Sequence, residues 1–155
     1  MVHQGEKTMS EPVSVFAAPR RYVQGRGALG TLSAGLERLG ASRPLVLLDP
    51  AVEEVTRSAL AAVSNAEIVR FGGECSPSEI DRVAGVASDS GADAVVAVGG
   101  GKAMDTAKAV ALPAGLKLVI APTIASTDAP TSALSVVYTD DGAFLEYRFW
   151  DSNPD

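Results

Sequence analysis

Four short apolar runs alternate with stretches of helical length along the middle of the chain, and this alternation limits the fold more than any other feature. Each run is rich in Val, Leu or Ile and is bounded by turn-forming residues, which is typical of strands buried on both faces of a sheet. Strands separated by helices predict an α/β fold, a parallel sheet with helices on both faces. The predicted strands cover residues 43–48, 66–71, 93–98 and 117–121.

Helix signals fill the intervals between these runs. One of them is unusually complete, because Ser76, Pro77 and Glu79 predict a capping box. In such a box the serine hydroxyl and the glutamate carboxylate each accept a hydrogen bond from the other residue's backbone N–H. Gly91 suits the left-handed residue that follows a helix. The predicted helices cover residues 29–39, 50–63, 76–91 and 103–112.

The last third of the chain does not continue the alternation of strands and helices. Two runs of β-forming residues, 133–138 and 143–149, are separated by a polar turn that ends in Asp141-Gly142. An Asp-Gly pair between such runs predicts a β-hairpin. The polar segment 1–14 is expected to be a flexible tail, and residues 15–155 are expected to form one α/β domain whose sheet is incomplete.

Composition excludes several classes of protein. The 155 residues carry 13 Lys and Arg against 19 Asp and Glu, whereas a nucleic-acid surface needs a basic face and an anionic membrane attracts polybasic segments. No apolar run approaches the length of a membrane span, and the N-terminus lacks the apolar core of a secretory signal. One cysteine, Cys75, and one histidine, His3, leave no disulfide framework and almost no metal-ligand chemistry. A cytoplasmic protein without nucleic-acid or membrane partners is expected.

Two glycine clusters compete as phosphate-binding loops. The first, at residues 25–30, reads G-R-G-A-L-G and matches the G-x-G-x-x-G fingerprint of dinucleotide-binding folds. It follows a possible strand at 21–24, and Asp49 comes about twenty residues later, as the fingerprint requires. The preceding segment is short and polar, so a turn that leads into the helix at 29–39 explains these glycines equally well.

The second cluster, Gly99-Gly100-Gly101-Lys102, follows the most hydrophobic strand and opens a helix. Glycines let an anion approach backbone N–H groups, the helix dipole adds positive potential, and Lys102 adds a full charge. A pyrophosphate is the natural ligand of such a loop. The competing interpretation is a tight strand-to-helix turn that needs positive φ.

Two acidic residues follow predicted strands at the edge where open α/β sheets bind ligands. Asp49 could bind both hydroxyls of a ribose and repel a 2′-phosphate, which favours NAD over NADP, or it could be only the N-cap before Pro50. Asp128 is the single charge in a loop, 121–135, that combines two prolines with seven hydroxyl or carboxylate side chains. It is the natural anchor for substrate hydroxyls, unless the loop is merely a solvated connection.

Three stretches resemble the glycerol dehydrogenases of the iron-containing alcohol dehydrogenase superfamily. They are FGGEC (71–75), GGGKAMDTAKA (99–109) and APTIASTDAPTSALSVVYTDDG (121–142), and the resemblance covers nearly the whole chain after about Val15. It implies a Rossmann-like fold similar to the N-terminal domain of dehydroquinate synthase. It also implies that the second glycine cluster, and not the first, is the pyrophosphate loop.

The resemblance further implies roles for individual residues. Asp49 would bind the adenosine ribose of NAD, and Asp128 would hold the polyol substrate. The remaining cofactor contacts that it implies are Gly99, Gly100, Gly101, Lys102, Ala103, Thr123, Ile124, Ala125, Ser126, Ser132, Leu134 and Tyr138.

The activity implied by the resemblance is NAD-dependent oxidation of the secondary hydroxyl of glycerol to dihydroxyacetone, by a homo-oligomer. In that family a helical C-terminal domain supplies one Asp and two His to a divalent metal, usually zinc. Those ligands are expected beyond Asp155, so this chain would hold much of the cofactor half and no catalytic residue. Two alternatives remain open: a truncated, inactive nucleotide-binding fragment, or a relative that acts on another small diol or hydroxy acid.

Overall fold

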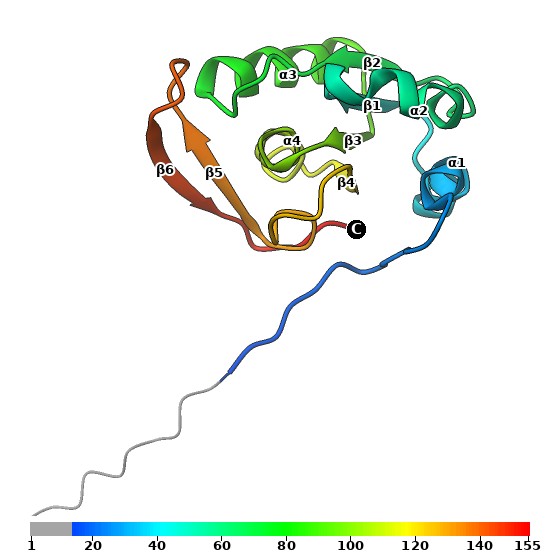
Figure 1. The fold of residues 1–155 in the computed structure, drawn as a ribbon, viewed down its shortest axis with the longest axis horizontal. Helices are drawn as coiled ribbons and strands as arrows, with labels where there is room; N and C mark the ends of the chain where they lie inside the picture. The colour runs from blue at the N-terminus through cyan, green and yellow to red at the C-terminus, as the bar shows by residue number, and fades with distance from the viewer. Residues whose placement is uncertain (1–13) are drawn as a thin grey trace, which may run out of the picture.

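The computed structural model describes residues 14–155, which form a four-stranded parallel sheet and a separate two-stranded hairpin (Figure 1). The sheet has the strand order β2-β1-β3-β4. Its strands are β1 (Pro44–Leu48), β2 (Glu67–Arg70), β3 (Ala94–Gly99) and β4 (Lys117–Pro122). The four predicted strands are therefore confirmed, each within one residue of its expected bounds.

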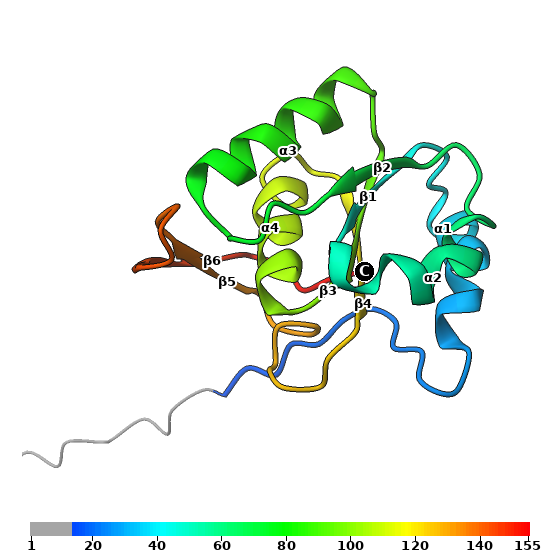
Figure 2. The ribbon, with the colours of Figure 1, turned by 45° about the horizontal axis from the view of Figure 1, so that its top comes forward.

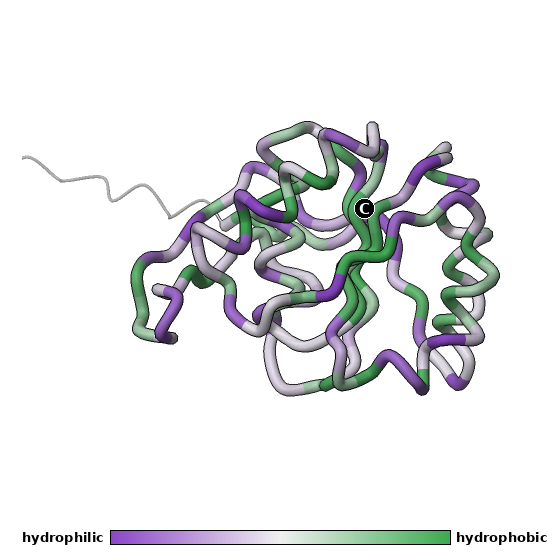
Figure 3. The backbone as a smooth tube through the Cα atoms, turned by 90° about the horizontal axis from the view of Figure 1, so that it is seen from above, coloured by the Kyte–Doolittle hydropathy of each residue, from purple (hydrophilic) through white to green (hydrophobic). Residues whose placement is uncertain are grey.

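Helices cover both faces of this sheet, as predicted (Figure 2). One face carries α1 (Leu32–Leu39) and α2 (Glu53–Leu60), and the other carries α3 (Pro77–Asp89) and α4 (Gly101–Ala111). Leu45 and Leu47 of β1 pack toward α3 and α4, whereas Val46 and Leu48 pack toward α1 and α2. Because successive strand residues point to opposite faces, a strand covered on both sides must be apolar throughout. Figure 3 shows the resulting hydrophobic band through the middle of the molecule.

Three predicted helices have different bounds. The helix predicted at 29–39 starts as the 3-10 turn η1 (Ala28–Thr31), and the one predicted at 50–63 starts as η2 (Pro50–Val52). The α-helical part of the latter ends at Leu60, because Val63 N–H donates to the Leu60 carbonyl (3.0 Å) in the tighter 3-10 pattern. α4 begins at Gly101, two residues before its predicted start at 103.

The predicted capping box of α3 forms only in half. Ser76 Oγ accepts a hydrogen bond from Glu79 N–H (3.4 Å), but the Glu79 carboxylate turns elsewhere. Its Oε1 accepts from Gly72 N–H (2.7 Å), and Arg82 donates to both of its oxygens (2.7 Å each). The reciprocal bond is lost because the fold brings Gly72 within reach, which the local sequence does not reveal. Gly91 has φ 62°, as predicted.

The predicted hairpin is present and packs against α4. Its strands are β5 (Leu134–Tyr138) and β6 (Phe144–Phe149), which are antiparallel. Gly142 in the turn has φ 86°. Ser135 and Val137 of β5 are fully buried, so α4 lies between the main sheet and the hairpin (Figures 1 and 2).

The possible strand at 21–24 does not form. Tyr22 is 68 % exposed and Val23 48 % exposed, so the segment has no buried apolar face that would fix it in a sheet. β4 is the edge strand of the described sheet, and at its start the Leu118 carbonyl accepts a hydrogen bond from Asp155 N–H (2.9 Å). Residues 1–13, most of the predicted tail, lie outside the described residues, and so does His3.

Candidate functional site

The strand order places a topological switch point between β1 and β3. From β1 the chain adds β2 on one side and then crosses over to add β3 on the other. The helices that follow β1 and β3 therefore lie on opposite faces, and open α/β sheets bind ligands beyond the carboxyl ends of two such strands. Asp49 directly follows β1, and Gly99 ends β3. The predicted acidic residue and the second glycine cluster thus flank the switch point.

Gly99 is required by close packing. Asp49 N–H donates to the Val98 carbonyl (2.9 Å), and Thr123 N–H donates to the Gly99 carbonyl (3.0 Å), which joins β1, β3 and the loop after β4. A Cβ on Gly99 would lie 2.8 Å from Asp49 Cβ and 3.0 Å from Ala103 Cβ. No side chain fits there without moving the backbone.

Gly100 and Gly101 are not required in this way. None of the three glycines has positive φ, so the tight-turn interpretation of the cluster is wrong. A Cβ on Gly100 would meet Ile124 Cγ2 at 3.6 Å, and one on Gly101 would meet Thr127 Cγ2 at 3.6 Å, both ordinary contacts. Neither positive φ nor packing therefore explains why these two positions lack side chains. Without side chains, the backbone at the start of α4 is open to the approach of a ligand.

The first turn of α4 supplies hydrogen-bond donors at the same place. Gly100 is the N-cap residue and has no side chain to offer the helix, and the bond from Met104 N–H to the Gly100 carbonyl (3.1 Å) is the first of the α-helical type. The N–H groups of Gly101, Lys102 and Ala103 precede that bond and have no partner within the helix. With the helix dipole they form a site of positive potential that suits an anion.

The first glycine cluster forms a turn instead. Gly25 has φ 145° and Gly27 has φ 78°, and Ala28 N–H donates back to the Gly25 carbonyl (3.1 Å). The cluster follows no strand and leads into the short η1, so it lacks the strand-turn-helix context that a dinucleotide fingerprint needs. Positive φ explains Gly25 and Gly27, whereas Gly30 has ordinary φ and lies within η1.

Asp49 combines both interpretations given to it. Its Oδ1 accepts a hydrogen bond from Ala51 N–H (3.0 Å) and so caps η2. Its Oδ2 lies 3.5 Å from where a Cβ of Gly99 would stand, on the side of the glycine loop. Capping occupies one oxygen and leaves the other toward the switch point. Ribose binding therefore stays a prediction that the geometry permits.

Lys102 and Tyr138 meet on the hairpin side of α4. Lys102 Nζ lies 2.6 Å from Glu74 Oε2 and 4.9 Å from the centroid of the Tyr138 ring. Sequence reasoning included Lys102 and Tyr138 but missed Glu74. No local pattern links Glu74 to Lys102, because the two residues are 28 positions apart.

A buried ion pair on α4, Asp105 and Lys108, was also missed. The Lys108 side chain is fully buried, and its Nζ donates to Asp105 Oδ1 (3.1 Å), the Leu134 carbonyl (2.7 Å) and Ser132 Oγ (3.3 Å). Burial lowers the pKa of Lys108 and raises the pKa of Asp105, while the attraction between the two opposes both shifts. The pair fixes two predicted contact residues, Ser132 and Leu134, against α4. Its signal in the sequence is an Asp and a Lys one turn apart in an alanine-rich helix.

Internal hydrogen bonds shape the loop after β4. The Asp128 carbonyl accepts from the N–H groups of Thr131 (2.9 Å) and Ser132 (3.0 Å), and Asn153 Nδ2 donates to the Thr131 carbonyl (2.6 Å). Ala129 is buried beneath the loop. The exposed part carries the predicted substrate residue and four predicted cofactor contacts: Asp128, Thr123, Ile124, Ala125 and Ser126.

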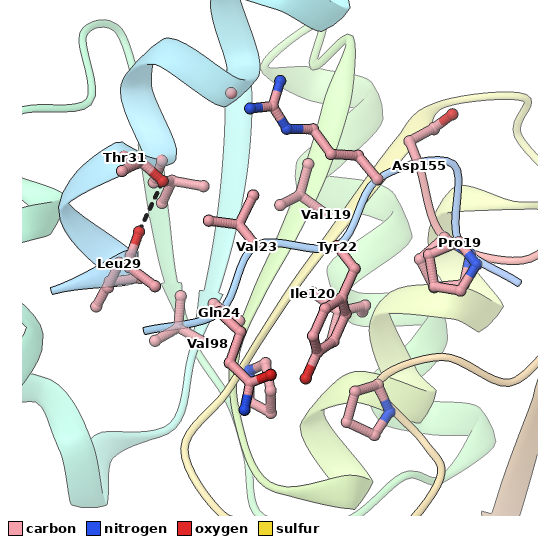
Figure 4. A pocket seen from close by; sticks show the side chains of 18 of the residues that line it. Pro19, Tyr22, Val23, Gln24, Leu29, Thr31, Val98, Val119, Ile120 and Asp155 are labelled. Atoms are coloured by element: carbon pink, nitrogen blue, oxygen red, sulfur yellow. Dashed lines mark hydrogen bonds between the residues drawn. The ribbon is translucent and has the colours of Figure 1, made fainter. Parts of the chain in front are cut away.

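A cleft of about 550 Å³ adjoins this loop on the α1 side of β4. Figure 4 shows Tyr22 and Val23 of the extended N-terminal segment lying across the strand that carries Val119 and Ile120. The cleft reaches Thr123 but is not lined by the second glycine cluster. It therefore borders the anion site and does not contain it.

Neither a metal site nor a membrane span occurs among the described residues. Among residues 14–155, no three His, Cys, Asp or Glu side chains gather in an arrangement that could hold a metal ion. Within the same range, no helix is long and apolar enough to cross a bilayer.

Comparison with known families decides the relationship that the motifs suggest. The pattern of the family described as iron-containing alcohol dehydrogenase matches residues 19–155. This chain belongs to that family. The matched range includes Asp49, the second glycine cluster and the loop after β4, so the resemblance seen in the motifs is confirmed.

The relatives are much longer than this chain. A glycerol dehydrogenase from Thermotoga maritima is 46 % identical over 141 residues, which is 88 % of this chain and 38 % of the relative. A glycolaldehyde reductase from Halobacterium salinarum is 45 % identical over 146 residues, 92 % of this chain and 40 % of the relative. The crystal structure of a probable glycerol dehydrogenase from Sinorhizobium meliloti matches with a TM-score of 0.84 at 46 % identity, covering 91 % of this chain and 39 % of that one. The chain thus spans about two fifths of their length and corresponds to an N-terminal portion.

Proposed function

We propose that this chain is the NAD-binding part of a metal-dependent polyol dehydrogenase that acts on glycerol. The relatives named glycerol dehydrogenase support the activity. The observation that carries the proposal is the pair Gly100 and Gly101, which lack side chains for no reason of φ or packing and stand at the start of α4. A pyrophosphate needs both features, because it binds to open backbone N–H groups at a helix N-terminus.

The dinucleotide would lie across the switch point. Its pyrophosphate would accept hydrogen bonds from the N–H groups of Gly101, Lys102 and Ala103, and the second oxygen of Asp49 would accept hydrogen bonds from a ribose. The exposed loop after β4 would form the opposite wall. The proposed contacts in that wall and beyond it are Thr123, Ile124, Ala125, Ser126, Ser132, Leu134 and Tyr138.

Asp128 is proposed to hold the polyol. A carboxylate accepts hydrogen bonds from two neighbouring hydroxyls, and Asp128 stands on the exposed loop next to the proposed cofactor wall. When bound, NAD would take up the hydride from the carbon that bears the secondary hydroxyl. Residues 14–155 offer no ligand set for a divalent metal, and the ligands of the zinc that the family resemblance implies stay expected beyond Asp155.

Gly100→Ala tests the pyrophosphate assignment. The NAD dissociation constant is measured by calorimetry on the protein at the length its gene encodes. A methyl group in the space of a phosphate oxygen should weaken binding about tenfold, or roughly 1.4 kcal/mol, while the free energy of unfolding should fall by no more than about 1 kcal/mol, because glycine is a better N-cap residue than alanine. Gly85→Ala is the matched control, because Gly85 is exposed in α3 with no atom within 4 Å of an added Cβ. Equal NAD affinity in the two variants would contradict the assignment.

Two further variants separate the acidic residues. Asp49→Asn keeps an oxygen to cap η2 but removes the charge, so selection against NADP should relax. An unchanged NAD to NADP preference would leave Asp49 with capping alone. Asp128→Ala should raise KM for glycerol with little change in NAD affinity. A parallel fall in NAD affinity would remove Asp128 from the substrate site.

Two alternatives to this function, another substrate and an inactive nucleotide-binding chain, can be tested by experiment. The glycolaldehyde reductase among the relatives favours a small aldehyde or diol as a second candidate substrate, and kcat/KM for glycerol and for glycolaldehyde decides between them. An intact mass of the natural protein near 15.9 kDa would instead favour an inactive nucleotide-binding chain.

A further inference from the structure

Lys102 stands where a cation is electrostatically unfavourable. It is the second residue of α4, and the positive end of a helix dipole repels a cation. A contact with the pyrophosphate would remove this conflict. In the structure, however, the Lys102 ammonium is turned to Glu74, 2.6 Å from Oε2.

Glu74 is well fixed at a junction of three segments. Its Oε1 accepts a hydrogen bond from Cys75 N–H (3.1 Å). Its side chain is 18 % exposed, against 46 % for that of Lys102. A Cβ on Gly142 would lie 3.4 Å from Glu74 Oε2, so the hairpin turn borders the carboxylate. Glu74 thus links the loop before α3, the first turn of α4 and the hairpin.

The same junction fixes Tyr138. Its N–H donates to the Cys75 carbonyl (2.8 Å), and the Lys102 ammonium lies 4.9 Å from the centroid of its ring. A cation over an aromatic face is attracted by the ring quadrupole. The Tyr138 backbone is thus held by Cys75, the neighbour of Glu74 in sequence. The Tyr138 ring is contacted by Lys102, the ion-pair partner of Glu74. Lys102 thus lies between the Glu74 carboxylate and the Tyr138 ring.

We propose that Glu74 is a positioning residue of the cofactor site, which neutralises Lys102 and holds it against Tyr138 so that the pyrophosphate is bound by backbone N–H groups alone. This inference rests on the proposed function. Lys102 then has a conformational role beside the loop and is not the counter-ion of the phosphates. The two roles predict different NAD affinities for a variant that lacks both charges of the pair.

A double-mutant cycle of Glu74 and Lys102 separates the two roles by NAD affinity. Glu74→Gln keeps the shape and an acceptor for Cys75 N–H but frees the Lys102 charge. NAD should then bind about threefold more tightly at low salt, and the gain should disappear at about 0.5 M salt, where screening is strong. Lys102→Met alone should weaken NAD binding at low salt, because it leaves the Glu74 carboxylate unpaired beside the loop, and the double variant should return to the affinity of the unsubstituted protein. A purely structural role of Glu74 would not produce a salt-dependent gain.

Glu37→Gln is the matched control for charge. Glu37 lies in α1 near Gly40, whose carbonyl accepts a hydrogen bond from Lys117 Nζ. Lys117 starts β4, so Glu37 lies toward the amino ends of the strands, away from the glycine loop at their carboxyl ends. This control should leave NAD affinity unchanged. A double variant that binds NAD as weakly as Lys102→Met alone would show that Lys102 contacts the phosphates and would overturn the proposal, as would equal affinity across the cycle at low salt. Failure of the unsubstituted protein to bind NAD would instead overturn the proposed function, and the same cycle is then read with inorganic pyrophosphate.

Discussion

Replacing Gly99 with alanine should push β1 and α4 away from the end of β3. The added Cβ would lie 2.8 Å from Asp49 Cβ and 3.0 Å from Ala103 Cβ. Carbon atoms pack best at about 3.5–4.0 Å, so these contacts need to open by about 0.5–1 Å. Both opposing atoms are Cβ atoms and cannot rotate away. The backbone of Asp49 or of the first turn of α4 must therefore move.

The expected loss of stability follows from two opposing effects. Overpacking a well-packed region costs about 1–3 kcal/mol. Alanine also restricts the unfolded chain, which returns about 0.4–1 kcal/mol because Gly99 does not need positive φ. The net effect should be a loss of about 1–2 kcal/mol. For a chain of this size that corresponds to a fall in Tm of roughly 2–8 °C.

Urea unfolding of three variants isolates the cause. Gly99→Ala should lower the free energy of unfolding. Gly100→Ala should lower it by less than Gly99→Ala does, because its Cβ would have an ordinary 3.6 Å contact and only the poorer N-cap preference of alanine acts against it. Gly85→Ala, inside exposed helix, should raise it by about 0.5–1 kcal/mol. If Gly99→Ala is as stable as Gly85→Ala, the close approach of β1, β3 and α4 at this residue is refuted.

Three further predictions concern ionisable groups. Burial alone would raise the pKa of Asp93, but hydrogen bonds from the N–H groups of Ser42 and Arg43 and from the Ser42 hydroxyl lower it to about 2. Asp93→Asn should therefore be less stable than the unsubstituted protein at pH 7, by about 1 kcal/mol after solvent screening. This difference should vanish as the pH falls from about 4 to about 2 in acid-titrated urea unfolding. Burial raises the pKa of the Cys75 thiol to about 11, so a thiol reagent at pH 8 should react only on unfolding, and fast labelling of the native protein would contradict its burial. Lys108→Met should cost about 3–5 kcal/mol, because it leaves a buried carboxylate unpaired. Adding Asp105→Asn should recover part of that loss, and full additivity of the two changes would argue against the pair.

The sheet could be predicted from sequence because its signal is local. β1 and β3 are covered on both faces, so every residue from Pro44 to Leu48 and from Ala94 to Gly99 is buried and the apolar runs are continuous. The hairpin could also be predicted from sequence, because its Asp-Gly turn needs a glycine at positive φ. The possible strand at residues 21–24 does not form. The segment is short and polar, and strand formation also depends on a neighbouring strand that the local sequence cannot supply.

Side-chain partners were the part that could not be predicted. The Glu79 carboxylate binds Gly72 instead of closing its capping box, and Glu74 reaches Lys102 across 28 positions. Glu79 thereby loses its local partner, whereas Glu74 keeps the N–H of Cys75 and adds a distant partner that only the tertiary structure brings close. Ion pairs and hydrogen bonds depend on atomic distance, and a one-dimensional pattern fixes distance only within a helix turn or a strand pair.

The two glycine clusters show why a motif needs its physical cause before it can indicate function. Gly25 and Gly27 satisfy a fingerprint, yet positive φ explains them completely. Gly99 has ordinary φ but no room for a Cβ, so packing explains it. Gly100 and Gly101 have ordinary φ and room for a methyl group, so neither cause applies to them. Gly85 in the middle of α3 meets the same two conditions, so it is the place of Gly100 and Gly101 at the start of α4, beside the switch point, that makes a ligand of the backbone their proposed cause. Those two residues, and not the better match to the fingerprint, are therefore the ones whose substitution should separate binding from folding.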